Sequence, residues 1–126
     1  MKGVMQLVWR LDKNRGICPQ LCEQLCARIV AKEFLPDQRL MSVRELALET
    51  GVNPNTVQRA FEQLEQEGVL RSERGSGWYV SEDPSCAQTL YQSMVEQKFR
   101  QFFLEMQDLG MTPDAVKVLV KEWENG

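Results

Sequence analysis

The pattern that most constrains this chain lies over residues 42–68, where the start and stop signals of two helices follow one another closely. Ser42 to Glu45 spell S-x-x-E, a capping box that predicts a helix beginning just after Ser42. Gly51 suits the left-handed residue that ends such a helix. Asn53 and Pro54 then supply an N-cap and a first residue for the next helix. Two short helices joined by a glycine-containing turn predict a helix-turn-helix.

The second of these helices has two different faces. Its apolar residues are Val57, Ala60, Phe61 and Leu64, and the polar residues Asn55, Gln58, Arg59 and Glu62 repeat that spacing two positions earlier. Two positions correspond to about 200° around a helix, so the two sets point in opposite directions. We expect the apolar face to pack in the core and the polar face to contact a partner. Gly68 ends the helix.

A β-hairpin is predicted directly after this helix. Its strands are residues 69–72 and 78–81, and they flank the basic, glycine-rich segment Glu73-Arg74-Gly75-Ser76-Gly77. A hairpin beside a helix-turn-helix is a wing. Its glycines allow the backbone to approach a phosphate or a minor groove without an intervening Cβ.

Two elements are predicted before the helix-turn-helix. Residues 6–11 form a short strand or an extended arm with Trp9 as its anchor, and residues 12–16 form a turn. Pro19 suits the first turn of a helix that runs to about Lys32 on an apolar stripe. That stripe consists of Leu21, Leu25 and Ile29. The segment LPDQR is expected to be a connection.

The C-terminal third is predicted to be two helices. Asp83-Pro84 marks a boundary and the cap of a long helix, and Thr112 begins a short final one. The long helix carries a heptad seam, formed by Val95, Phe99, Phe102, Met106 and Leu109. A single helix cannot bury such a seam, so it either folds back on the preceding domain or pairs with a second chain, and we favour pairing.

We therefore expect a mainly α fold with a small β wing. Residues 1–82 would form a winged helix-turn-helix domain with an N-terminal arm, and residues 83–126 a two-helix dimerisation region.

Composition excludes several classes of function. The 126 residues contain no histidine, the commonest general base and zinc ligand, and no phosphate loop or paired-carboxylate motif replaces it. Neither an enzyme nor a cofactor is expected. The chain has no apolar run of about 20 residues, and its N-terminus becomes charged too soon for a signal peptide. We therefore expect a cytoplasmic protein without membrane contact.

The net charge of −3 is unevenly distributed. Residues 1–80 contain 11 Lys and Arg against 10 Asp and Glu, whereas residues 81–126 contain 4 against 8. The acidity therefore lies in the C-terminal third, and the overall charge neither favours nor excludes binding to DNA.

Cys18, Cys22 and Cys26 recur every four residues, which places them on one side of a helix. They could form a thiolate metal site or a redox sensor. The favoured alternative is that Cys22 and Cys26 broaden the buried stripe, because free cysteine packs as a small hydrophobe. A zinc site would need four ligands and usually a C-x-x-C turn, neither of which is evident.

The segments GICPQL, LMSVRELALETGVNPNTVQRAFEQLEQEGVL and RGSGWYV, in this order, resemble the GntR superfamily of bacterial transcription regulators. The GVNPNTVQ run and the short acidic helical tail resemble its YtrA-like branch. The resemblance implies a winged helix-turn-helix that binds a palindromic DNA operator as a homodimer. In this branch, operons for ABC-type transporters are frequent targets.

The resemblance also implies a DNA-binding surface. Asn and Gln can bond adenine in bidentate fashion and Arg can bond guanine, while Arg44 and Arg74 would contact the backbone on either side. The expected contact residues are Ser42, Arg44, Asn53, Asn55, Thr56, Gln58, Arg59, Arg74, Gly75, Ser76 and Gly77. Asn53 is a cap whether or not DNA is bound, and Arg71 is expected to face solvent or pair with a glutamate.

The sequence departs from the family pattern at several positions. Pro54 and Gln58 stand where many members carry arginine, so the operator sequence cannot be carried over. Lys32 and Asp37 replace glycines. Met41 replaces a proline, and Cys18 replaces a tyrosine.

Two alternatives remain at the level of sequence. The winged domain could bind another protein, which would require an apolar patch where the second helix carries Asn55, Gln58 and Arg59. A thiol- or metal-responsive regulator is compatible with DNA binding, but it would need exposed cysteines close together. No effector is identified.

Overall fold

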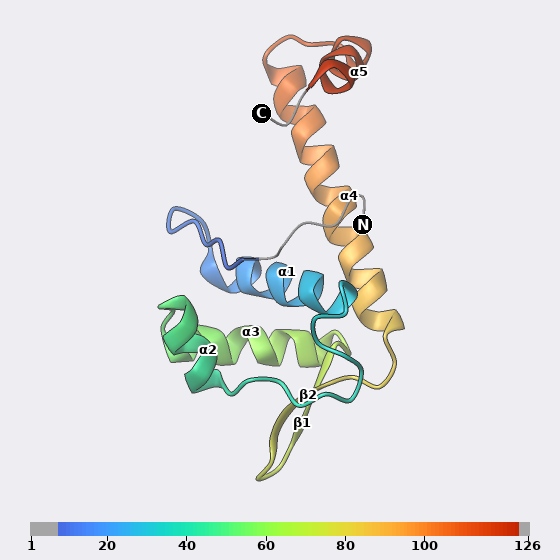
Figure 1. The fold of residues 1–126 in the computed structure, drawn as a ribbon. Coiled ribbons are helices and arrows are strands. Elements are labelled where there is room, and N and C mark those ends of the chain that lie inside the picture. Colours follow the sequence, from blue (N-terminus) through green and yellow to red (C-terminus); the bar gives the residue numbers. More distant parts are fainter. Residues whose placement is uncertain (1–7, 124–126) are drawn as a thin grey trace. The chain divides into compact units, whose positions relative to one another are not determined.

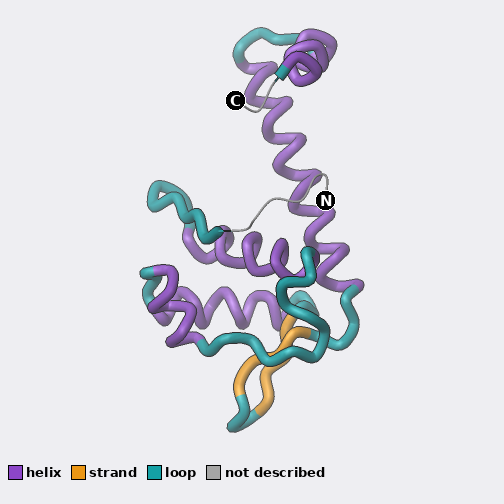
Figure 2. Tube along the Cα trace, viewed as in Figure 1, coloured by secondary structure: helices purple, strands orange, loops and turns teal. Residues whose placement is uncertain are grey.

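The computed structural model describes residues 8–123, and their arrangement is mainly helical (Figures 1 and 2). The elements are α1 (Ile17–Val30), α2 (Val43–Thr50), α3 (Pro54–Gln66), β1 (Leu70–Glu73), β2 (Gly77–Val80), α4 (Ser85–Asp108) and α5 (Pro113–Glu122). The predicted fold class, mainly α with a small β wing, is confirmed.

The chain divides into two compact units, Met1–Tyr91 and Gln92–Gly126. The division falls inside α4, because the start of this helix packs within the first unit. Ala87 is buried, and its carbonyl accepts a hydrogen bond from the Cys26 thiol at 3.3 Å. The winged unit therefore extends past the boundary predicted after residue 82 and includes the first turns of α4.

The core of the first unit lies between α1 and α3, which run side by side (Figure 1). It contains the apolar stripes predicted for both helices, namely Leu21, Leu25 and Ile29 of α1 and Val57, Ala60, Phe61 and Leu64 of α3. Phe61 also meets the Trp78 ring edge-on at 5.4 Å between centroids, which attaches the wing to α3. The burial of one α3 face leaves its opposite face exposed.

The turn between α2 and α3 forms as the sequence predicts. Both halves of the Ser42–Glu45 capping box are present, and Gly51 ends α2 with φ 73°. The Asn53 side chain accepts a hydrogen bond from the amide of Asn55 at 2.8 Å. These local bonds fix the angle at which α3 leaves the turn.

The wing is an antiparallel hairpin in which Leu70 pairs with Val80 and Glu73 with Gly77. A third segment, which we expected to be a connection, pairs with β2. The Asp37 amide donates to the Val80 carbonyl at 3.0 Å, and the Leu40 amide donates to the Trp78 carbonyl at 2.8 Å. The preceding segment 37–40 thus holds the base of the wing.

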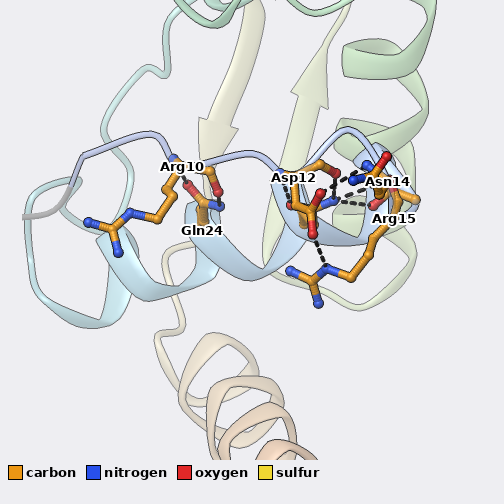
Figure 3. Close-up of polar contacts among 7 residues, drawn as sticks. Arg10, Asp12, Asn14, Arg15 and Gln24 are labelled. Carbon is orange, nitrogen blue, oxygen red and sulfur yellow. Dashed lines mark hydrogen bonds and ion pairs between the residues drawn. The ribbon is translucent and has the colours of Figure 1, made fainter.

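The N-terminal arm contains no strand over residues 8–11, and it lies along α1. Arg10 exchanges two backbone hydrogen bonds with the Gln24 side chain, at 2.9 and 2.6 Å, as Figure 3 shows. The indole of Trp9 donates to Glu49 at 3.2 Å, and the Arg28 guanidinium lies 3.8 Å from the Trp9 ring centroid. Trp9 is therefore the anchor that we predicted. Gln6 and Leu7 lie outside the described residues.

The second unit contains the rest of α4 together with α5. Thr112 caps α5 by accepting a hydrogen bond from the Ala115 amide at 3.2 Å, and Val116 is buried. Phe103 packs edge-on against Phe99 and Phe102, with centroid distances of 4.8 and 5.8 Å. Within the described residues, no helix is both long and apolar enough to cross a membrane.

Candidate DNA-binding surface

The outward face of α3 is polar, as predicted. Asn55, Arg59 and Glu62 are exposed and Gln58 is half-buried. The Gln58 amide donates to the Glu62 carboxylate at 3.1 Å, and the Arg59 guanidinium donates to the Thr56 hydroxyl at 3.3 Å. These bonds within one helix orient amide and guanidinium donors along its first two turns. The face offers no apolar patch of the kind that the protein-binding alternative requires.

Two of the predicted contact residues have structural roles at helix starts. The Ser42 hydroxyl accepts from the Glu45 amide at 3.0 Å, and the Glu45 carboxylate accepts from the Ser42 amide at 2.8 Å. These bonds from Ser42 lower the pKa of Glu45. Asn53 caps α3 through a single bond, which its side chain accepts from the Asn55 amide. The Ser42 hydroxyl hydrogen and the Asn53 amide group remain available for a further acceptor.

The tip of the wing presents Arg74, which is exposed. The Ser76 amide donates to the Glu73 carbonyl at 3.0 Å, and Gly75 has φ 76°, a conformation that favours glycine. The Ser76 hydroxyl is hydrogen-bonded to the Tyr79 hydroxyl, so it fixes the tip.

Arg71 lies on the same hairpin but is neutralised by two carboxylates. Its guanidinium contacts Asp37 at 2.9 Å and Glu73 at 3.3 Å, and it stacks 4.8 Å from the centroid of the Tyr79 ring. Of the two expected environments, solvent or a glutamate partner, the structure shows the glutamate, Glu73, and adds Asp37.

The structure collects the predicted contact residues in one compact unit, on the start of α2, the first two turns of α3 and the wing. A groove of about 460 Å³ joins the N-terminal arm to the turn before α3, and Asn53, Thr56 and Lys13 are among its lining residues. Arg39, which lies beside the wing, is a residue that the sequence did not single out, because nothing local distinguishes it within LPDQRL.

The cysteines of α1 behave as core residues, which confirms the favoured interpretation. Cys26 is fully buried and Cys22 is 5% exposed, and the Cys22 thiol donates to the Ala60 carbonyl of α3 at 3.6 Å. Burial raises the pKa of Cys22 to about 12 and that of Cys26 to about 11. Since thiolates are the reactive and metal-binding form, this environment opposes both chemistries at neutral pH. Cys18 is half-buried.

Together, the fold and this polar surface define a winged helix-turn-helix protein of the DNA-binding class. The sequence matches the family described as bacterial regulatory proteins, gntR family, over residues 19–80. The chain belongs to the GntR family.

Similar proteins span nearly the whole chain. The uncharacterized HTH-type transcriptional regulator YhcF of Bacillus subtilis is 32% identical over 93% of this chain and 97% of its own length. The HTH-type transcriptional repressor YtrA of the same organism is 33% identical over 82% of this chain and 78% of its own. A GntR family transcriptional regulator from Listeria monocytogenes superimposes with a TM-score of 0.79 at 32% identity, covering 90% of this chain and all of that one.

These relatives establish the general function. The chain is a DNA-binding transcription regulator of the GntR family, and it is similar to the YtrA-like members that the short acidic tail indicated. These relatives are described as DNA-binding regulators and not as enzymes.

Proposed function

We propose that the protein is a cytoplasmic repressor that binds a palindromic operator as a homodimer and controls a transporter operon. The repressor role is supported by YtrA, which is named a repressor and is similar over most of both chains. The transporter operon follows from the resemblance to the YtrA-like branch.

The observation that carries the homodimer is the exposed apolar surface of the second unit. Phe99 is 60% exposed, Val95 50% and Leu109 79%. Beside them, an almost wholly apolar groove of about 360 Å³ is lined by Phe102, Met106, Leu119, Val120 and Trp123. Apolar surface of this extent is typical of an interface. A second copy of α4 and α5 would cover it, since the same seam is present on each chain.

A palindromic operator follows from this symmetry. Each winged unit would place the first turns of one α3 in a major groove, with Asn55, Gln58 and Arg59 facing the bases. Two such units related by a two-fold axis bind two half-sites of opposite direction, whose centres lie about one helical turn of DNA apart or a multiple of it. Arg44 and Arg74 would contact the backbone of each half-site.

Titration of a labelled duplex from the chain's own promoter region tests the operator. We expect binding that weakens steeply with salt, because phosphate contacts release counterions. The Arg44→Ala/Arg74→Ala double variant should bind more weakly and with a shallower salt dependence. Absence of salt-sensitive binding by the unmodified protein would overturn the proposal. Repression is measured separately with a reporter gene behind that promoter, and reporter expression that falls when the regulator is deleted would contradict it.

A further inference from the structure

Arg39 occupies a defined place on the outer face of the wing. It forms an isolated antiparallel bridge with Tyr79 of β2, and Tyr79 pairs in turn with Arg71 of β1. Directly paired residues project to the same face of a sheet. The neighbouring Leu40 is buried, which directs Arg39 to the solvent side.

The Arg39 guanidinium lies against the backbone at Gly77. A Cβ built at Gly77 would be 3.5 Å from both Nε and Nη2 of Arg39. The guanidinium thus packs against the backbone at Gly77, whose φ of 120° is a conformation that favours glycine. The positive φ is a reason for glycine at this position within the protein itself, in addition to the close approach of DNA that the sequence predicts.

Arg39 also lies close to the start of α2. Its charge contributes to lowering the pKa of Glu45, the carboxylate that completes the capping box of that helix. The guanidinium is thus placed between two predicted DNA contacts, the start of α2 with Arg44 and the wing that carries Arg74 at its tip.

The two arginines on this face differ in their charge environment. Arg71 is paired with Asp37 and Glu73. Arg39 is exposed, and no carboxylate in the described part of the chain forms an ion pair with it. A guanidinium that is held in place but not neutralised can donate in bidentate fashion to a phosphate.

We propose that Arg39, packed against the backbone at Gly77, is a phosphate-binding residue that connects the DNA contacts of α2 with those of the wing. The inference rests on the DNA-binding surface proposed above. It adds a residue from the segment before α2, which the predicted surface did not include.

The test compares Arg39→Ala and Arg39→Lys with the matched control Arg71→Ala, an arginine on the same face that is already paired. Affinity is measured from about 50 to about 300 mM salt on two labelled duplexes of equal length, one from the promoter region and one of random sequence. We expect Arg39→Ala to weaken binding to both duplexes by the same factor, about 5–10-fold at about 0.1 M salt, and to reduce the salt slope by about 0.9. Arg39→Lys should restore the slope, and Arg71→Ala should leave it unchanged.

Thermal unfolding of the same variants separates this role from a structural one. If Arg39→Ala weakens binding with an unchanged salt slope, or if Arg39→Lys and Arg39→Ala lower the unfolding temperature and the affinity alike, Arg39 only supports the wing and the inference is wrong. If the unmodified protein shows no salt-dependent binding, the proposed operator function fails instead. The two failures are therefore distinguishable.

Discussion

Lys32 and Asp37 have left-handed backbone conformations, with φ 66° and 65°, although neither is a glycine. The family pattern has glycine at both positions. A residue with a Cβ there is therefore expected to lower the stability of the folded chain. A side chain with a Cβ is disfavoured in this region by about 1–2 kcal/mol, and the greater freedom of glycine in the unfolded chain offsets part of that difference.

Lys32→Gly should therefore raise the free energy of unfolding by about 0.5–1 kcal/mol, because the backbone strain is relieved and the lysine side chain is exposed. Asp37→Gly is the matched comparison, since φ is almost identical but the carboxylate pairs with Arg71 at 2.9 Å. Asp37→Gly should raise the free energy of unfolding less than Lys32→Gly does. The difference should be up to about 1 kcal/mol, because the exposed ion pair with Arg71 is lost. Urea unfolding measures both, and destabilisation by Lys32→Gly would contradict the expectation.

The buried thiols of Cys22 and Cys26 predict a loss of stability at alkaline pH. In the folded chain their pKa values are about 12 and about 11, against an ordinary value of 9.0. Well below pH 9.0 both thiols are protonated in both states, and the stabilisation is complete. Above it the unfolded chain releases these protons first, so the free energy of unfolding falls by about 1 kcal/mol per thiol per pH unit until the folded thiols also ionise.

The control for the thiol prediction is the Cys22→Ala/Cys26→Ala double variant, in which tyrosines and lysines still titrate. Urea unfolding between about pH 8 and about pH 11 should give a flatter pH dependence for this variant than for the unmodified protein. Equal slopes would show that other groups cause the alkaline loss. At neutral pH the double variant should be less stable, because it removes two buried sulfur atoms.

At the scale of elements, the parts that depend on neighbouring residues were predictable. The capping box, Gly51 and Asn53 determine α2, the turn and the start of α3 through bonds that span four residues or fewer. The two faces of α3 followed from helical spacing. Helical spacing is therefore sufficient to predict which face of α3 is polar and turned away from the core.

The parts that depend on distant residues were not predictable. The segment 37–40 has no alternating pattern that would predict a strand. Its pairing with β2 depends on hydrogen bonds from Asp37 and Leu40 to strand residues about 40 positions later in the chain. For the same reason the sequence did not reveal Arg39 beside Gly77. The bond from the Asp12 amide in the turn to the Gln20 side chain, and that from the Gln24 side chain to the Arg10 carbonyl in the arm, also have no sequence signature.

The division of work within the surface leads to a prediction for Arg44 and Gln58. Arg44→Ala should weaken binding to a promoter duplex and to a random duplex by the same factor, because a phosphate contact is independent of sequence. Gln58→Ala should weaken binding mainly to the promoter duplex, by about 1–3 kcal/mol, because an amide reads base edges. Competition titrations with both duplexes measure the difference. If Gln58→Ala lowers the affinity for both duplexes equally, Gln58 contacts the DNA backbone and not a base.

At the scale of the whole molecule, the two compact units suggest separable tasks. The first contains the predicted DNA contacts, and its core is closed by residues of its own, including Ala87 at the start of α4. The second leaves most of its large apolar side chains exposed. The first unit thus buries its own core, whereas the second leaves apolar side chains for a partner to cover. We expect this difference of a DNA-binding domain with an attached dimerisation region.

We therefore expect that the proposed dimer can be disrupted while the winged unit stays folded. Light scattering of the unmodified protein at micromolar concentration should give the mass of a dimer, and the Phe99→Asp/Phe102→Asp variant should give that of a monomer, because paired carboxylates cannot be buried in an apolar seam. Leu104→Asp is the matched control, since Leu104 is 49% exposed on the same helix but lies outside the seam, and it should remain dimeric. The monomeric variant should bind an isolated half-site with unchanged affinity and lose cooperative binding to two half-sites. A monomeric mass for the unmodified protein would exclude the homodimer, and dissociation by Leu104→Asp alone would place the interface on another face of α4.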